Sequence, residues 1–230
     1  MSSRSPTTLL LRDELVGFAK SKVMLVLWVI LPLIAIGAYL VLPAELTGQR
    51  DMKMSATAFV GLVTSSLAGT VGALMVAVDI VSERNRKVYE LFAIRPIRRE
   101  AIIWAKFVAV FACVTVACLA AMGAGIAVDA LRGAPPTTAM LADMGKSILS
   151  LVGVIALSAA VGVVFGVLSR TILVAVILIL YVGQNLAVVP MLPVYLGWLP
   201  DQFWLVMAIT AALTGLLVFG AGVKFRRTEL

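Results

Sequence analysis

The chain alternates between long apolar stretches and short polar links. The six apolar stretches cover residues 23–42, 56–81, 101–131, 147–168, 172–189 and 203–223. Each is close to or above the roughly 20 residues that a helix needs to cross the hydrocarbon of a bilayer. Lipid offers no hydrogen-bond partners to a backbone, so an open-ended spanning segment must be helical. The pattern therefore predicts an all-α membrane protein with six transmembrane helices.

Composition agrees with a single membrane domain over residues 1–230. Hydrophobic residues make up 62% of the chain and charged residues 13%, whereas soluble domains average about 25% charged residues. Histidine is absent, which excludes a histidine metal centre or general base. No acidic pair lies at mid-span, so an intramembrane enzyme is not favoured. Cys113 and Cys118 share one apolar stretch and match no metal or redox motif, so we interpret them as packing residues.

Residues 7–22 predict an amphipathic helix that lies along the inner membrane surface. At helical spacing one side carries Leu11, Leu15, Phe18 and Ala19, and the other side carries Asp13, Gly17 and Lys20. The apolar run that follows has the length of a full span, and Asp13 and Glu14 precede it, so a cleaved signal peptide is not expected. The alternative is a merely polar leader.

Lysine and arginine set the predicted orientation. Of the 19 such residues, only four fall on one side of the predicted membrane: Arg50, Lys53, Arg132 and Lys146. Because the side rich in these residues faces the cytoplasm, both termini and the link between the second and third spans are predicted to be cytoplasmic. The expected location is the cytoplasmic (inner) membrane.

The link at 188–202 is unusually apolar for an exposed loop. It contains Pro190, Pro193, Gly197 and Pro200, which prevent one continuous helix. We expect a re-entrant or interfacial hairpin on the outer side, with Tyr195 and Trp198 at the level of the headgroups. An outer loop lying on the bilayer is the alternative.

Small residues recur at helical spacing in several spans. Such ridges mark places where helix backbones approach each other in lipid. They comprise Ser158, Gly162 and Gly166; Ala117, Ala121 and Gly125; and Gly61, Gly69 and Gly72. We interpret them as helix contacts within one subunit, with a contact between subunits as the alternative.

The link from Ser82 to Glu100 concentrates the charge of the chain. Glu83 and Lys87 form a favourable pair at helical spacing, Ser82 or Asp79 is placed to cap a helix, and Pro96 ends it. Its charged ends enclose the apolar and aromatic residues Val88, Tyr89, Leu91 and Phe92. A short helix of this kind fits a groove on another protein. Docking to anionic lipid is the alternative.

This link resembles the stretch after the second span of ABC-transporter permeases of the type-2 exporter class. Glu83, Glu90, Pro96, Arg98 and Lys106 match the pattern, while Lys87-Val88-Tyr89 stands where Gly-Thr-Leu is usual. The resemblance implies that the link forms a cytoplasmic coupling helix that binds an ATPase. The implied coupling residues are Glu83, Arg84, Arg86, Lys87, Val88, Tyr89, Glu90, Leu91, Phe92, Pro96 and Arg98.

The resemblance also implies a half-size permease that works as a dimer with a second copy or homologue, each bound to a separate ABC ATPase. ATP and Mg would be held by that partner, and this chain would hold no cofactor and bind no nucleic acid. Its only Gly-Lys-Ser, Gly145–Ser147, has Met140 where a phosphate-binding loop needs its first glycine. A secondary transporter is a rival, although no span has an acidic residue near its centre. A signalling or assembly complex is another.

The cargo is expected to be apolar or amphipathic, such as a lipid, drug or peptide, because no buried charge is predicted along the path. The polar residues that we expect along the path are Gln184, Asn185, Thr64, Ser65 and Ser66. Each is also suited to an interhelical hydrogen bond.

Overall fold

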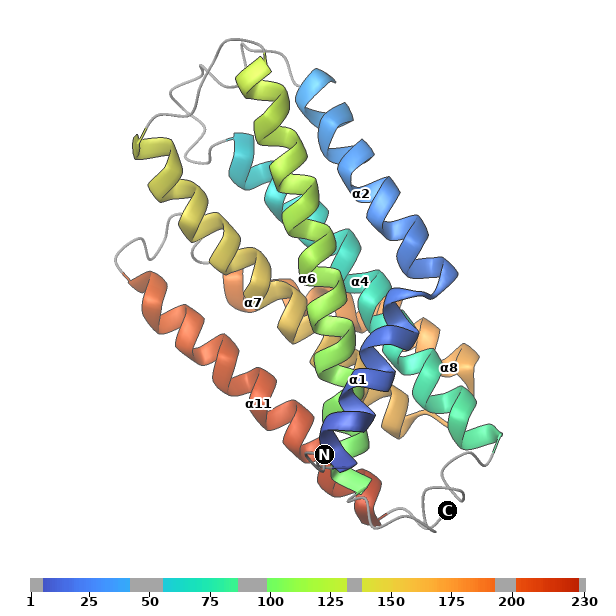
Figure 1. Ribbon diagram of the computed structural model, residues 1–230. Helices are drawn as coiled ribbons and strands as arrows, with labels where there is room; N and C mark the ends of the chain where they lie inside the picture. The colour runs from blue at the N-terminus through green and yellow to red at the C-terminus, as the bar shows by residue number, and fades with distance from the viewer. Residues whose placement is uncertain (1–5, 42–55, 87–98, 132–137, 193–201, 228–230) are drawn as a thin grey trace, which may run out of the picture.

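The computed structural model describes residues 6–41, 56–86, 99–131, 138–192 and 202–227, and within these ranges it contains helices and no strands (Figure 1). The α-helices are α1 (Pro6–Ala19), α2 (Lys22–Val41), α4 (Ala56–Asn85), α6 (Arg99–Leu131), α7 (Thr138–Leu168), α8 (Ile172–Leu178), α9 (Gln184–Val188) and α11 (Phe203–Arg227). The all-α class is confirmed.

Four of the described helices are long and apolar enough to cross a membrane. The qualifying segments are Ser66–Asn85 in α4, Glu100–Ala127 in α6, Gly145–Leu168 in α7 and Phe203–Arg227 in α11. Helices α1 and α2 meet at a bend of 60° and provide a fifth candidate if the pair is one span. The chain is thus a multi-pass membrane protein with four or five candidate spans in its described part, where the sequence predicts six.

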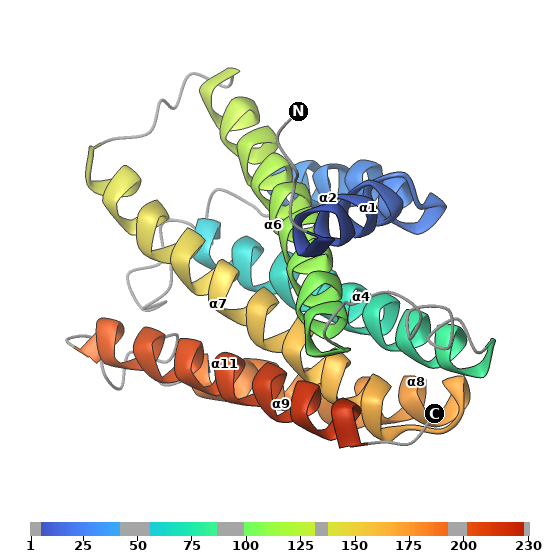
Figure 2. The ribbon, with the colours of Figure 1, turned by 60° about the horizontal axis from the view of Figure 1, so that its bottom comes forward.

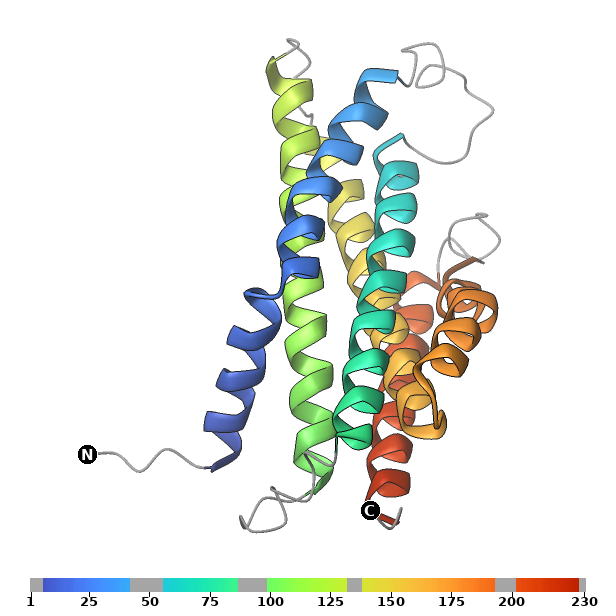
Figure 3. The ribbon, with the colours of Figure 1, turned by 90° about the vertical axis from the view of Figure 1, so that its right-hand side faces the viewer.

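The structure differs from the prediction at residues 172–189, which do not form one regular span. Helix α8 passes into a π-helical turn, Ile179–Gly183, then into α9 and a 3₁₀ turn, Val189–Met191. Pro190 lies in that last turn and lacks the N–H that would continue an α-helix. The apolar helix Ile172–Gly183 is shorter than a span requires. In Figure 3 this segment lies beside one end of the bundle and does not reach the far end of α6.

Helices α6 and α7 form the centre of the bundle. Helix α6 contacts α1, α2, α4, α7 and α11, and α7 contacts α4, α6 and α11. The buried share of the apolar segment is 72% in α7 and 28% in α11, so α11 lies at the periphery. Helices α2 and α11 cover opposite sides of the bundle (Figure 2).

Glycines bring the backbones of α4 and α7 into contact. A Cβ atom added to Gly162 would lie 2.6 Å from the Cα of Ala73, and one added to Gly166 would lie 2.9 Å from the Cα of Ala77. Gly69 on α4 leaves room for a side chain instead, because a Cβ atom added there would lie 2.6 Å from Oγ of Ser158 on α7. The contacts of Gly69, Gly162 and Gly166 are therefore within one subunit, as the sequence predicts for these positions, and the side of α4 at Gly61 lies outside the described residues.

Helix α1 has the two faces that its sequence predicts. Phe18 is buried, and Leu11, Leu15 and Ala19 pack against the core, whereas Asp13, Gly17 and Lys20 are exposed. The apolar face rests on α6. The start of α1, the end of α4, the start of α6 and the end of α11 lie at the same end of the bundle (Figures 1 and 3).

Candidate functional site

Lys106 is a buried cation two turns into α6. Its side chain is 0% exposed, although it lies within an apolar run that includes the buried residues Ile103 and Phe107. An isolated ammonium group in such a place would cost several kcal/mol of desolvation. The fold must therefore supply counterions.

Three carboxylates surround the ammonium group of Lys106. Its Nζ lies 2.9 Å from Glu83 Oε1 and 3.0 Å from Glu14 Oε1, and it also donates a hydrogen bond to Asp79 Oδ2. An ammonium group has three N–H donors, so the number of partners matches the number of donors. The cluster joins α1, α4 and α6 through four side chains.

Helix periodicity explains the convergence. Asp79 and Glu83 are four residues apart on α4 and therefore share a face, which is turned toward α6. Glu14 is on α1, which packs along the same part of α6. We refer to Glu14, Asp79, Glu83 and Lys106 as the lysine cluster.

The lysine cluster has more negative than positive charge. Three carboxylates face one ammonium group, which gives a formal charge of −2 when all are ionised. The exposed fraction of the side chain is 16% for Glu14, 33% for Asp79 and 25% for Glu83, whereas it is 0% for Lys106. Within the described residues Glu83 Oε2 has no hydrogen-bond partner. This oxygen is itself buried, so part of the negative charge of the lysine cluster lacks a hydrogen-bond partner among the described residues.

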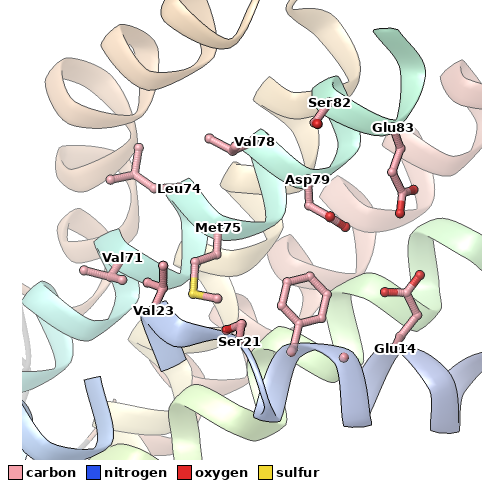
Figure 4. A pocket seen from close by; sticks show the side chains of 12 residues that line it. Glu14, Ser21, Val23, Val71, Leu74, Met75, Val78, Asp79, Ser82 and Glu83 are labelled. Atoms are coloured by element: carbon pink, nitrogen blue, oxygen red, sulfur yellow. The ribbon is translucent and has the colours of Figure 1, made fainter. Parts of the chain in front are cut away.

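A groove of about 690 Å³ adjoins the lysine cluster between α1, the start of α2, and α4. Figure 4 shows the carboxylates of Glu14, Asp79 and Glu83 at one end and apolar side chains at the other. The lining residues are Glu14, Gly17, Phe18, Ser21, Val23, Val71, Leu74, Met75, Val78, Asp79, Ser82 and Glu83. All three carboxylates line the groove, and Lys106 does not.

Two further ionic contacts lie at the same end of the bundle. Arg84 on α4 donates hydrogen bonds to the carbonyl oxygens of Val167, at 3.1 Å, and of Ser169. These carbonyls belong to the end of α7, where backbone acceptors lack helical partners. Arg226 on α11 pairs with Glu100 on α6 at 2.9 Å. The end of α4 is therefore joined to the end of α7 through a side chain and backbone carbonyls, and the start of α6 is joined to the end of α11 through two side chains.

The predicted coupling residues lie only partly within the described chain. Glu83 belongs to the lysine cluster, Arg84 is bonded to α7, and Arg86 is exposed just after α4. The others, Lys87, Val88, Tyr89, Glu90, Leu91, Phe92, Pro96 and Arg98, lie outside the described residues. The capping role considered for Ser82 or Asp79 is wrong, because α4 continues through both to Asn85.

None of the predicted path residues with a described side chain lines the groove. Thr64 is buried in α4, and the carbonyl of Ser66 accepts a hydrogen bond from Thr70. Asn185 is exposed, and its Nδ2 donates to the carbonyl of Tyr181 one turn earlier, at 2.9 Å. The side chains of Ser65 and Gln184 lie outside the described residues. A path along these residues stays a prediction.

The sequence interpretation missed how Lys106, Glu14 and Asp79 come together. The sequence places Lys106 in a family pattern, Asp79 at a possible helix cap and Glu14 before the first span, and none of these patterns predicts that the three side chains meet. A usable signal was present, because a lone lysine inside the run Ile102–Val110 requires counterions. Asp79 and Glu83 at helical spacing, near the end of the preceding span, were the nearest candidates.

The described residues show no group of acidic and cysteine side chains able to hold a metal ion. Cys113 and Cys118 are buried and unbridged, in accordance with their predicted packing role. Gly145–Ser147 lies inside α7, so it is helical and does not form a phosphate-binding loop.

Comparison with known proteins yields one family. The sequence profile described as ABC-2 family transporter protein matches residues 42–204. This range includes α4, α6, α7, α8 and α9, together with three of the four residues of the lysine cluster. No curated protein matches the chain.

Proposed function

Because the chain belongs to the ABC-2 transporter family and is thus a membrane subunit of the ABC transporter class, we propose that it is the permease of an ATP-driven exporter. In this proposal two permeases assemble with separate ATPase subunits and move an apolar or amphipathic compound out of the cytoplasm. ATP and Mg bind the ATPase. The permease lies in the cytoplasmic membrane with both termini inside.

The lysine cluster is the observation that carries this proposal. Helix α4 ends at Asn85 and α6 begins at Arg99, so these two helices bracket the link that is predicted to bind the ATPase. Asp79 and Glu83 lie within the last two turns of α4, and Lys106 lies in the second turn of α6. A displacement of the link therefore acts on both helices at once, and the cluster resists their separation.

Other contacts extend this linkage to the rest of the bundle. Glu14 brings α1 into the lysine cluster, Arg84 holds the end of α7, and Glu100 holds Arg226 of α11. A force applied between α4 and α6 is thereby shared among five helices. A subunit that is driven by a separate ATPase requires this transmission of force from the docking link to the rest of the bundle.

Co-purification with the ATPase tests the docking. Tyr89→Ala combined with Leu91→Ala should abolish co-purification while the permease still inserts, because both side chains belong to the predicted docking helix. A matched control is Tyr181→Ala combined with Leu180→Ala, since these side chains are exposed on another part of the surface. Equal co-purification of both double variants with the ATPase would refute the docking assignment.

Transport itself separates export from signalling or assembly. Inside-out vesicles that contain the permease and its ATPase should accumulate a lipophilic compound only when ATP is supplied. Accumulation driven by an ion gradient without ATP would favour a secondary transporter. ATP hydrolysis without accumulation of any compound would favour the signalling alternative.

A further inference from the structure

The groove beside the lysine cluster owes its shape to a break between α1 and α2. Ser21 lies between α1, which ends at Ala19, and α2, which begins at Lys22. It caps the start of α2, because its Oγ accepts a hydrogen bond from the backbone N–H of Met24 at 3.2 Å. The two helices then diverge by 60°. Ser21 lines the groove opposite α4, so the bend leaves a wedge of space that neither helix fills.

The groove has an acidic end and an apolar wall. Asp79 and Glu83 from α4 and Glu14 from α1 form the acidic end (Figure 4). The wall is formed mainly by Val23, Val71, Leu74, Met75 and Val78. Within the described chain no lysine or arginine lines this groove.

Lys106 does not neutralise the groove as seen by a ligand. The ammonium group is completely buried behind the carboxylates, and the ring of Phe18, which lines the groove, lies 6.0 Å from it. Three carboxylates face one cation, so the formal charge at the acidic end of the groove is negative, and the carboxylate side chains are only 16–33% exposed. Such a site attracts a cation strongly, because charges interact more strongly in surroundings of low dielectric constant.

We propose that this groove binds a monocationic amphiphile that enters from the inner leaflet, with its cation at Asp79 and Glu83 and its apolar body along Val71, Leu74 and Met75. A volume of about 690 Å³ falls in the range of ligand pockets, roughly 300–1,000 Å³. A metal ion is not the expected occupant, because the apolar wall offers it no ligands and the described acidic residues form no metal site. The inference depends on the proposed function only for the direction of transport.

Equilibrium binding to the full chain with its ATPase, in nanodiscs of neutral lipid, tests the proposal. Tetraphenylphosphonium is the probe, and tetraphenylborate is a control of similar size and opposite charge. The phosphonium should bind saturably and the borate should not displace it. Saturable binding of the borate alone, or of neither ion, would overturn the proposal.

Gly17→Phe is the decisive variant. Gly17 lines the groove and no atom lies within 4 Å of the position of a new Cβ, so a phenyl group can occupy the groove without disturbing α1. Phosphonium affinity should fall at least tenfold. Gly123→Phe is the matched control, since Gly123 on α6 is also exposed and unobstructed but lies outside the groove.

Glu83→Gln tests the contribution of the carboxylate charge without changing the volume of the groove. The glutamine keeps the size of the side chain, and Lys106 retains Glu14 and Asp79 as partners. Phosphonium affinity should fall several-fold, and the affinity for a neutral analogue, triphenylphosphine oxide, should not fall. Equal phosphonium affinity in the wild type, Gly17→Phe and Glu83→Gln would refute the site.

Two further outcomes separate this inference from the exporter proposal, and a third would overturn the inference. If the ATPase co-purifies but phosphonium binding is absent, the site is wrong and the exporter proposal stands. If phosphonium binds and Gly17→Phe abolishes it while no ATPase associates, the site is supported and the exporter proposal fails. If Gly17→Phe disrupts a dimer and the wild type binds no phosphonium, the groove is a contact between subunits and the inference is wrong.

Discussion

At the scale of single residues, Lys106 is the one fully buried charged side chain in the part of the chain that the structure describes. Its three carboxylate partners come from two other helices, so the charge balance exists only in the folded bundle. Removing one member of a buried ion pair leaves the others without compensation. The stability of the bundle should therefore depend on Lys106 more than on any exposed charge.

Lys106→Met should destabilise the permease by about 3–5 kcal/mol, because three neighbouring carboxylates would lose their common cation. Unfolding in mixed detergent and dodecyl sulfate measures this change. Lys146→Met is the control, because Lys146 is exposed on α7. The triple variant Glu14→Gln, Asp79→Asn and Lys106→Met should regain part of the lost stability, because two of the three uncompensated carboxylates are then neutral. Equal stability of the two single lysine variants would contradict the prediction.

Glu100→Gln should have a much smaller effect. The pair between Glu100 and Arg226 is on the surface, with Arg226 61% exposed, and exposed ion pairs contribute about 0–1 kcal/mol. The same unfolding assay should show a change below about 1 kcal/mol. A loss as large as that of Lys106→Met would mean that this pair is shielded from water by lipid or by a partner.

At the scale of elements, the contact between α4 and α7 is the tightest that the glycines create. The backbone of Ala73 fills the space where Gly162 lacks a side chain, and Ala77 does the same for Gly166. Helix association in lipid depends on such close packing because there is little hydrophobic drive between helices. A single added methyl group is therefore enough to force the backbones apart.

Gly162→Ala should destabilise the permease by about 1–3 kcal/mol, the usual range for overpacking, because the new Cβ would lie 2.5 Å from the carbonyl oxygen of Ala73. Gly145→Ala on the same helix has no neighbour within 4 Å and should be neutral or slightly stabilising. Thermal aggregation in detergent compares the two. A neutral Gly162→Ala would show that α4 and α7 separate easily.

Local patterns predicted most of the elements and few of their contacts. The apolar runs predicted α2, α4, α6, α7 and α11, because the number of consecutive apolar residues can be compared directly with the length that a membrane span requires. The π-helical turn after α8 was missed, because it has no comparable periodic signal. The partners of Lys106 were missed for a different reason: they lie on α1 and α4, and their pairing depends on how distant helices pack.

At the scale of the whole molecule, the charged helix ends gather on one side. The start of α1, the end of α4, the start of α6 and the end of α11 share one end of the bundle (Figure 3). The sequence predicts the same grouping from the excess of lysine and arginine. The shared position of these helix ends would be the same in either orientation, so the orientation needs a separate test.

Cysteine labelling of intact cells tests the orientation. In a background of Cys113→Ala and Cys118→Ala, an impermeant maleimide should label Gln49→Cys in intact cells. It should label Ser3→Cys and Thr228→Cys only after permeabilisation, because both termini are predicted to be cytoplasmic. Labelling of the termini in intact cells would reverse the topology and contradict docking of a cytoplasmic ATPase.

The glycine contacts between α4 and α7 also limit how the protein can change shape. Two helices whose main chains touch cannot slide or tilt independently without a steric collision, so they travel together as one rigid unit. Helix α2 touches α4 only sparingly. The groove lies beside this loosely packed seam, so a movement of α2 against the α4–α7 unit is expected to change the shape of the groove.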